Sequence, residues 1–101
     1  MIVRVWRGWT TPANAEAYEA FLFEDLLPQV KAIDGFISAE ILHRVDGEEI
    51  AWVSILKFES MEHIKAFAGD APEKAVLEPE ALALLSRYDE HVNHYETRSL
   101  V

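Results

Sequence analysis

The sequence of 101 residues contains no cysteine, so it offers neither a disulfide framework nor thiolate chemistry. Basic residues are also few, since 9 Lys and Arg stand against 18 Asp and Glu and give a net charge of −9. Such a charge repels phosphate backbones and acidic membrane surfaces. We therefore expect neither nucleic acid nor a membrane as a partner.

Long hydrophobic runs are absent too. No apolar run approaches the roughly 18 residues that span a bilayer. The N-terminal segment carries Arg4 and Arg7 within its apolar pattern, which argues against a signal peptide. These absences favour a cytoplasmic protein.

Half of the residues are apolar, which at this length predicts a single domain over residues 1–101 with a modest core. β-Branched and aromatic runs predict strands, and helical periodicity behind capping residues predicts helices. Asp46-Gly47 between two apolar runs is a strong hairpin signal. The expected order is β-α-β-β-α-β, with strands over 2–10, 36–45, 50–58 and 88–97, helices over 13–30 and 61–68, and a short helical piece after Pro79.

Single residues sharpen these expectations. Ser60 is expected to accept a hydrogen bond from the first turn of the second helix, and Gly69 to end that helix. Pro28 is expected to kink the first helix or to end its regular hydrogen bonding. In the last helical piece, the spacing predicts an inward face made by Ala81, Leu82 and Leu85.

The middle strands are apolar on both faces. In the strand over 50–58 the two alternating sets are Ala51, Val53 and Ile55 on one side, and Ile50, Trp52, Leu56 and Phe58 on the other. Helices cover one face of such a sheet, so the other apolar face needs a cover, and an identical sheet is the economical one. We expect a homodimer formed by sheet-to-sheet packing, with Val53 and Ile41 on the interface side.

Five short motifs, in their order and spacing, resemble the antibiotic biosynthesis monooxygenase-like family of small dimeric α/β-barrel proteins. The motifs are Arg4–Gly8, Phe58–Ser60, Ile64–Gly69, Glu73–Val76 and His94–Glu96. The resemblance covers the whole chain. It implies an α+β, ferredoxin-like fold with a four-stranded antiparallel sheet, helices on one face, and a dimeric α/β barrel.

The resemblance also implies a function. Family enzymes oxidise aromatic polyketides with molecular oxygen and use no metal, flavin or haem, because the deprotonated substrate supplies the electrons. By this resemblance the chain is an oxidoreductase, a cofactor-independent monooxygenase acting on an electron-rich aromatic or quinol-like small molecule. The implied catalytic residues are His94, Tyr95 and Arg4, and the implied substrate-binding residues are Trp6, Trp52, Phe58 and Phe67.

Each implied role has a chemical reason. His94 titrates near neutral pH and suits a proton acceptor, while Arg4 or Tyr95 would donate to developing negative charge on oxygen. Successive strand residues face opposite sides, so His94 and Tyr95 share one site only at an edge or bulge. His91 and His94 oppose one another in the same way, and we expect no metal site. Phe58 stands where many relatives carry tryptophan and lacks the indole N–H donor.

Two other functions remain open at this stage. A dimeric barrel with an apolar pocket could bind a small hydrophobic ligand without catalysis. Haem-degrading relatives share the fold but carry a ligand histidine after the second helix, an asparagine in the first strand, and the tryptophan that Phe58 replaces. In this sequence the range 70–80 holds no histidine and the range 2–10 holds no asparagine.

Overall fold

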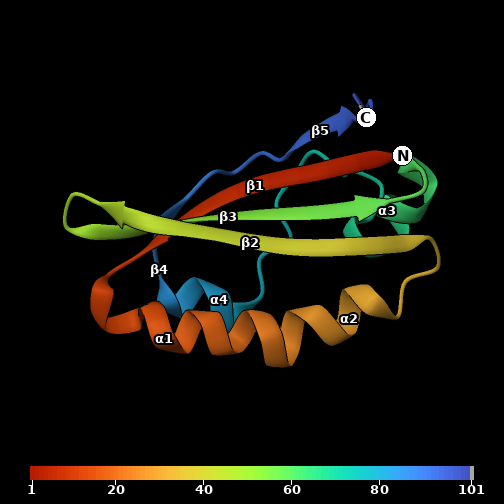
Figure 1. The fold of residues 1–101 in the computed structure, drawn as a ribbon. Helices are drawn as coiled ribbons and strands as arrows, with labels where there is room; N and C mark the ends of the chain where they lie inside the picture. Colours follow the sequence, from red (N-terminus) through yellow and green to blue (C-terminus); the bar gives the residue numbers. More distant parts are fainter. Residues whose placement is uncertain (101) are drawn as a thin grey trace.

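A computed structural model describes residues 1–100 of the chain (Figure 1). Its elements are β1 (Ile2–Thr10), α1 (Pro12–Phe21), the π-helical turn η1 (Leu22–Leu26), α2 (Leu27–Lys31), β2 (Phe36–Asp46), β3 (Glu49–Phe58), α3 (Met61–Ala68), α4 (Pro79–Leu84), β4 (Leu85–Tyr88) and β5 (Asn93–Glu96). The first three strands begin and end within one residue of their predicted bounds.

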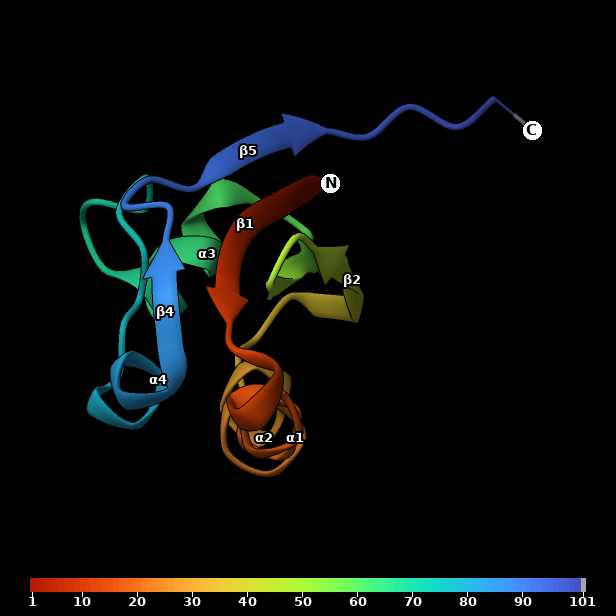
Figure 2. The ribbon, with the colours of Figure 1, turned by 90° about the vertical axis from the view of Figure 1, so that its left-hand side faces the viewer.

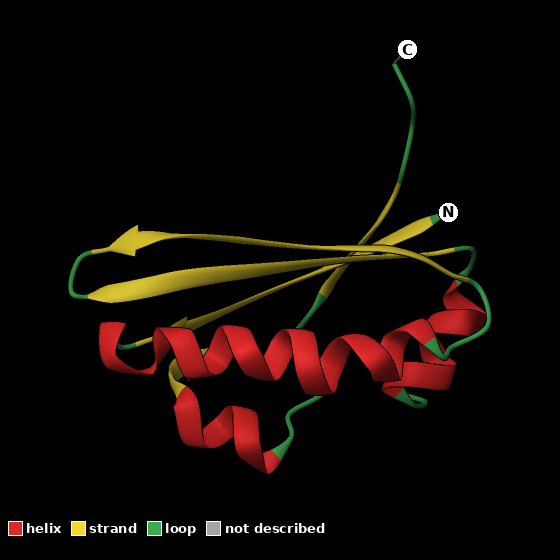
Figure 3. Cartoon of the chain, turned by 60° about the horizontal axis from the view of Figure 1, so that its bottom comes forward, coloured by secondary structure: helices red, strands yellow, loops and turns green. Residues whose placement is uncertain are grey.

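All pairings in the sheet are antiparallel, and the strand order is β2-β3-β1-β4, with β5 also paired to β1. The helices lie on one side of the sheet, and the other side is open within the chain (Figures 1 and 3). This is the predicted α+β, ferredoxin-like arrangement. None of the helices in the described part of the chain is long and apolar enough to cross a membrane.

Proline explains the break in the long first helix. Pro28 has no N–H to continue the helical ladder, and the turn before it is π-helical: the N–H of Leu27 bonds to the carbonyl of Leu22, five residues back. The side-chain amide of Gln29 donates to the carbonyl of Asp25 at 3.0 Å and satisfies an acceptor next to the break. The helix therefore continues past the proline with altered hydrogen bonding, as predicted.

The predicted single strand over 88–97 is wrong, because two short strands take its place. β4 pairs with Gly8–Thr10 and β5 with Ile2–Val5, so both run along the same edge of β1. Between them the chain pairs instead with the loop after α3. The N–H of Val92 donates to the carbonyl of Glu73 at 2.7 Å, and the N–H of Ala75 to the carbonyl of Glu90 at 3.1 Å.

Three local expectations need correction or confirmation. The hydroxyl of Ser60 does not cap α3; it bonds to Nδ1 of His63 at 2.8 Å. Gly69 does end α3, with a φ of 83° that glycine adopts without strain. Leu82 is not inward, since 42% of it is exposed, whereas Ala81 is buried. α4 has only six residues and turns directly into β4, so its inward face is narrower than the spacing suggested.

The hairpin register corrects the expected position of Ile41. Asp46 pairs with Glu49 across a two-residue turn, so odd residues of β2 share a face with even residues of β3, and Ile41 lies opposite Ser54. Ile41 packs against the helix-side core, while Val53 lies on the open face opposite Leu42. The two positions expected at one interface are thus on opposite faces.

The core between helices and sheet has two clusters. The first contains Tyr18, Phe21, Leu22, Trp52 and Ala81, and the second Val30, Leu56, Phe58 and Ile64. Leu26 of η1 packs against both. The π-helical turn therefore lies where the two halves of the core meet.

Candidate functional site

One cleft of the molecule lies between the sheet and the helical layer, next to the chain from α3 to α4. This first cleft encloses about 540 Å³, counting the solvent at its open mouth. In Figure 2, α4 lies beside α1 below the strands, and the segment over 69–78 runs from α3 past β4 to α4. The lining comes mostly from apolar side chains, and its members are Arg4, Trp6, Tyr18, Phe21, Leu22, Leu26, Ser54, Leu56, Phe67, Val76, Leu77, Glu78, Ala81 and Val92.

Arg4 is the cation of this lining, and only 4% of it is exposed. Its Nη1 donates to the carbonyl of Pro72 at 2.6 Å and lies 3.0 Å from Nε2 of His94, and its Nη2 donates to the carbonyl of Lys74 at 3.3 Å. The guanidinium also lies 5.7 Å from the ring centre of Phe67. Arg4 thus holds the segment after α3 against β1.

Burial changes the acid–base properties of both groups in this contact. Desolvation lowers the pKa of Arg4 from 12.5 to about 10, so the guanidinium stays charged at neutral pH. The pKa of His94 is also lowered, first by burial and then by the charge of Arg4, with Glu73 acting in the opposite direction. A neutral imidazole can accept the hydrogen bond from Arg4 through Nε2, whereas a protonated one cannot. The geometry therefore requires neutral His94.

Two of the aromatic residues expected at the site do line the cleft. Trp6 lies on the helix side of β1, and its indole N–H donates to the carbonyl of Asp89. Phe67 comes from the end of α3. Gly8 makes room for Trp6, since a Cβ there would lie 3.2 Å from the indole ring and 3.0 Å from Leu85. An apolar wall with aromatic faces suits a flat aromatic ligand.

The other residues expected at the site lie elsewhere. Trp52 and Phe58 are buried in the two core clusters and do not belong to the cleft lining. Tyr95 is next to His94 in β5 but lies opposite Val3 on the other face, and 55% of it is exposed. His94 contacts Arg4 behind the lining. The structure thus brings together Arg4, His94, Trp6 and Phe67.

Ser54 and Glu78 are polar members of the lining that sequence reasoning missed. Ser54 lies opposite Trp6 in the β1–β3 ladder, and its hydroxyl makes no hydrogen bond within residues 1–100. Glu78 is the N-cap residue of α4. A serine that interrupts the apolar helix-side set of β3 was a usable signal, but it required the correct face assignment. Among the described residues, no group of three His, Asp or Glu side chains is placed to hold a metal ion.

No family model matches the sequence, and no curated protein matches it. Solved structures match its fold. The monooxygenase ActVA-Orf6 of Streptomyces coelicolor, in complex with nanaomycin D, has a TM-score of 0.68 at 16% identity, covering 99% of this chain and 89% of that one. SnoaB, a cofactor-independent oxygenase of Streptomyces nogalater, has a TM-score of 0.62 at 14% identity, covering 99% and 96%. A mutant of MhuD with two manganese protoporphyrin IX molecules bound per active site has a TM-score of 0.62 at 22% identity, covering 100% and 98%.

These likenesses extend over nearly the full length of each chain. The protein therefore has the fold of the antibiotic biosynthesis monooxygenase-like proteins, as the sequence resemblance predicted. One fold carries several activities, so the particular activity must be argued from the cleft itself.

Proposed function

We propose that the protein is a cofactor-independent monooxygenase that oxidises an electron-rich aromatic or quinol-like small molecule with molecular oxygen. One observation carries the proposal: an aromatic-walled apolar cleft holds a buried, charged guanidinium. Within residues 1–100, Arg4 makes no ion pair with a carboxylate, and its hydrogen bonds go to neutral acceptors. Its positive charge is left to act on whatever occupies the cleft.

A cation that makes no ion pair in a mostly apolar cleft favours the anionic form of a bound phenol or enol, while the carboxylate of Glu78 in the same lining acts in the opposite direction. Coulomb interactions are stronger there than in water, so Arg4 would lower the pKa of the substrate hydroxyl. The resulting electron-rich anion is the species that reacts with oxygen in cofactor-free chemistry. The aromatic faces of Trp6 and Phe67 would hold its ring, and Ser54 would offer a further hydrogen bond.

The proposed reaction balances without a cofactor. A ring methylene activated by a neighbouring phenol or carbonyl loses two hydrogens and gains one atom of dioxygen to become a carbonyl. The second oxygen atom leaves with both hydrogens as water. All four electrons come from the substrate carbon, and dioxygen is the oxidant.

In this proposal His94 and Arg4 act as a pair. Arg4 turns one N–H toward the substrate oxyanion, and the Nε2 of His94 that it releases accepts the substrate proton. Glu78 lines the cleft itself, and its carboxylate is the alternative proton acceptor. Tyr95 has no part in the proposed step, because it faces the opposite side of the sheet.

Oxygen uptake with a panel of quinols and anthrones tests the proposal. Loss of a general base costs about 10² to 10⁴ in rate, and loss of an oxyanion donor about 10² to 10³. We expect losses of these sizes for His94→Gln and Arg4→Gln, and full activity for Arg7→Gln, an exposed arginine of the same strand. Full turnover in His94→Gln together with loss in Glu78→Gln would move the proton acceptor to Glu78.

A non-enzymatic ligand-binding protein is the second candidate, and one contact favours it. The imidazole of His94 lies outside the cleft lining, and Arg4 already occupies its acceptor nitrogen. A wild type that binds the same quinols and anthrones, shown by calorimetry, but takes up no oxygen with any of them would support this second candidate and exclude the oxygenase.

We further propose that the protein is a homodimer through the open face of the sheet. Val5, Val53 and Ile55 lie on this face, where no helix within residues 1–100 covers them. Burying apolar area stabilises association, and two such faces are self-complementary about a two-fold axis. The cleft lies on the opposite side of the sheet, so each subunit would keep its own complete site.

A further inference from the structure

A second cleft lies beside the first, at the edge where β2 ends the sheet. It encloses about 410 Å³, counting the solvent at its mouth, between the η1–α2 segment and the outer two strands. Its lining is entirely apolar: Leu22, Phe23, Leu26, Leu27, Val30, Ala39, Ile41 and Leu56. A cleft without any polar side chain gains from binding apolar groups and loses from binding polar ones.

The two clefts share a wall. Leu22, Leu26 and Leu56 line both of them, so one layer of leucine side chains separates the aromatic cleft with Arg4 from the apolar cleft at β2. Leu22 and Leu56 are buried, while Leu26 is half-buried. Leu26 is therefore the member of the wall with the most room to move.

The backbone that carries this wall is irregular. Leu22 and Leu26 are the first and last residues of η1, and Pro28 prevents the ladder from closing in the regular α-helical pattern. Single π-helical turns inside α-helices are frequent at functional sites. The irregular turn lies at the boundary between the two clefts.

We propose that the two clefts are compartments of one binding site, and that the second takes an apolar chain attached to the ring held in the first. The proposal rests on the proposed function for the ring-binding compartment. It specifies the ligand class as an aromatic anion or quinol that carries a hydrocarbon extension. Arg4 binds the oxygen-bearing end, and rotation of Leu26 admits the chain.

Exposure at the rim supports this occupant. Phe23 belongs to the second cleft, and 57% of it is exposed. Its ring would cover the far end of a bound chain and lose contact with water. The proposed dimer leaves this rim free, since it uses the opposite face of the sheet.

The test uses 4-alkylbenzoates with chains from methyl to octyl, measured by isothermal titration calorimetry. These compounds have a carboxylate for Arg4, a ring for the first cleft and a chain for the second, and they are not substrates for the proposed oxidation. Each buried methylene is worth about fourfold in affinity. We expect the affinity of the wild type to rise by about that factor per methylene once the chain is long enough to pass Leu26.

Ala39→Phe fills the second cleft from β2, and Leu27→Phe fills it from the helix side. Neither residue lines the first cleft. Both variants should bind 4-methylbenzoate within twofold of wild type and lose the gain with chain length. Val76→Phe, which fills only the first cleft, should weaken every compound in the series. Circular dichroism identifies any variant that fails to fold, and the pair of filling variants guards against that loss.

Three outcomes would overturn the proposal: a wild type that binds no member of the series, an affinity that does not rise with chain length, or an unchanged rise in both filling variants. If the chain effect is absent while quinols are still oxidised, the second compartment fails and the proposed function stands. If the chain effect is present while no quinol or anthrone is oxidised, the oxygenase fails and the two-compartment site stands.

Discussion

Each face of β1 carries an arginine, and the two arginines differ in burial and in their partners. Arg4 faces the helices, is almost fully buried, and bonds to two carbonyls and an imidazole. Arg7 faces the open side, where 59% of its side chain is exposed and it pairs with Asp89 at 2.8 Å. A charge screened by solvent and paired to a carboxylate has little left to offer a ligand. Burial without an ion-pair partner is the reason that the proposed function assigns the role in the cleft to Arg4 and not to Arg7.

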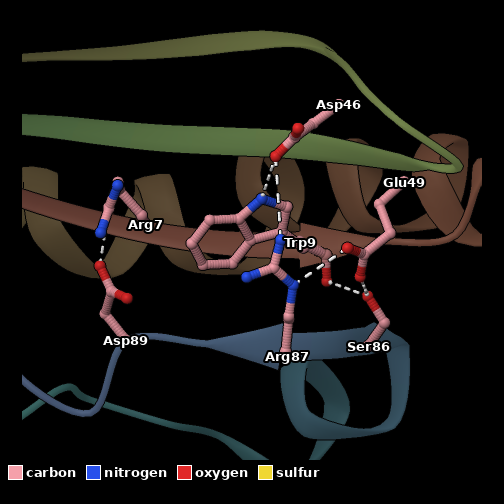
Figure 4. A network of polar contacts seen from close by, with 7 residues as sticks. All are labelled: Arg7, Trp9, Asp46, Glu49, Ser86, Arg87 and Asp89. Atoms are coloured by element: carbon pink, nitrogen blue, oxygen red, sulfur yellow. Dashed lines mark hydrogen bonds and ion pairs between the residues drawn. The ribbon is translucent and has the colours of Figure 1, made fainter.

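The open face of the sheet differs between its two ends, and Figure 4 shows the polar network near the hairpin. Near the hairpin, the ring of Trp9 is covered by the guanidinium of Arg87 at 3.9 Å, and its indole N–H donates to Asp46 at 2.9 Å. Glu49 completes the cluster through Ser86 and Arg87, and those hydrogen bonds lower its pKa. This end satisfies its own polar groups. The apolar residues Val5, Val53 and Ile55 have no such cover, and the dimer proposal rests on them, with Arg7 opposite Val53 as the charged neighbour.

The largest difference between the faces should appear on aromatic truncation. Phe58 is 0% exposed in the helix-side core, so Phe58→Ala should lower the free energy of unfolding by about 3–5 kcal/mol. Tyr95→Ala removes an exposed ring from the other face and should cost about 1 kcal/mol or less. Urea unfolding of both variants gives the comparison. Equal losses would show that the open face is as well packed as the core.

A charge introduced on the open face should weaken the proposed dimer. Val53→Asp places a carboxylate where we propose sheet-to-sheet packing, and it should raise the dimer dissociation constant by about 30-fold or more, equivalent to about 2 kcal/mol. Val45→Asp, the same substitution at a 71% exposed position on the opposite face of the sheet, is the matched control and should leave assembly unchanged. Sedimentation velocity over the micromolar range measures both. A wild type that stays monomeric over that range would exclude the dimer.

Local patterns in the sequence were sufficient for much of the fold. The hairpin signal at Asp46-Gly47, the break at Pro28 and the end at Gly69 all depend on backbone chemistry within a few residues, and all three agree with the structure. The sequence alone was also sufficient to predict which face of the sheet Ile41 occupies. A two-residue hairpin turn pairs odd with even positions, and applying that rule would have placed Ile41 with Ser54.

The site was harder to predict because it depends on contacts between distant segments. Arg4 contacts Pro72 and His94, which lie 68 and 90 residues further along the chain. The break between β4 and β5 arises from pairing with the loop around Glu73, which no local propensity encodes. Trp52 and Phe58 were expected in the pocket wall but lie in the core. An aromatic residue type alone does not distinguish a pocket wall from a core position.

The two arginines of β1 give a smaller and more specific comparison. Arg4→Gln removes a charged donor from the carbonyls of Pro72 and Lys74 and should cost about 1.5–3 kcal/mol of unfolding free energy. Arg7→Gln removes an exposed ion pair and should cost about 0–1 kcal/mol. Thermal or urea unfolding measures both. In Arg4→Gln, hydrogen exchange should also accelerate over residues 71–77, and unchanged protection there would show that Arg4 does not hold the segment.

The smallest expected effect is a pH dependence of the folding stability that is caused by the titration of His94. Its pKa in the folded chain lies below the ordinary 6.5, through burial first and then Arg4 of β1, opposed by Glu73 of the loop after α3. As the pH falls below about 6.5, the unfolded chain binds a proton at this position before the folded chain does. The stabilisation from neutral His94 is therefore complete above about pH 6.5 and is lost as the pH falls toward the lower folded value.

Urea unfolding at several pH values between about 5.5 and 7.5 measures this loss as the difference between wild type and His94→Gln, in which the carboxylate contributions common to both chains cancel. The difference should shrink as the pH falls, and Glu73→Gln should enlarge the wild-type loss by removing the charge that favours protonation. His91→Gln, at an exposed histidine outside the cleft, should run parallel to wild type. If His94→Gln and wild type lose stability in parallel as well, the Arg4–His94 hydrogen bond does not depend on a neutral imidazole, and the coupled roles proposed for the pair would have no basis.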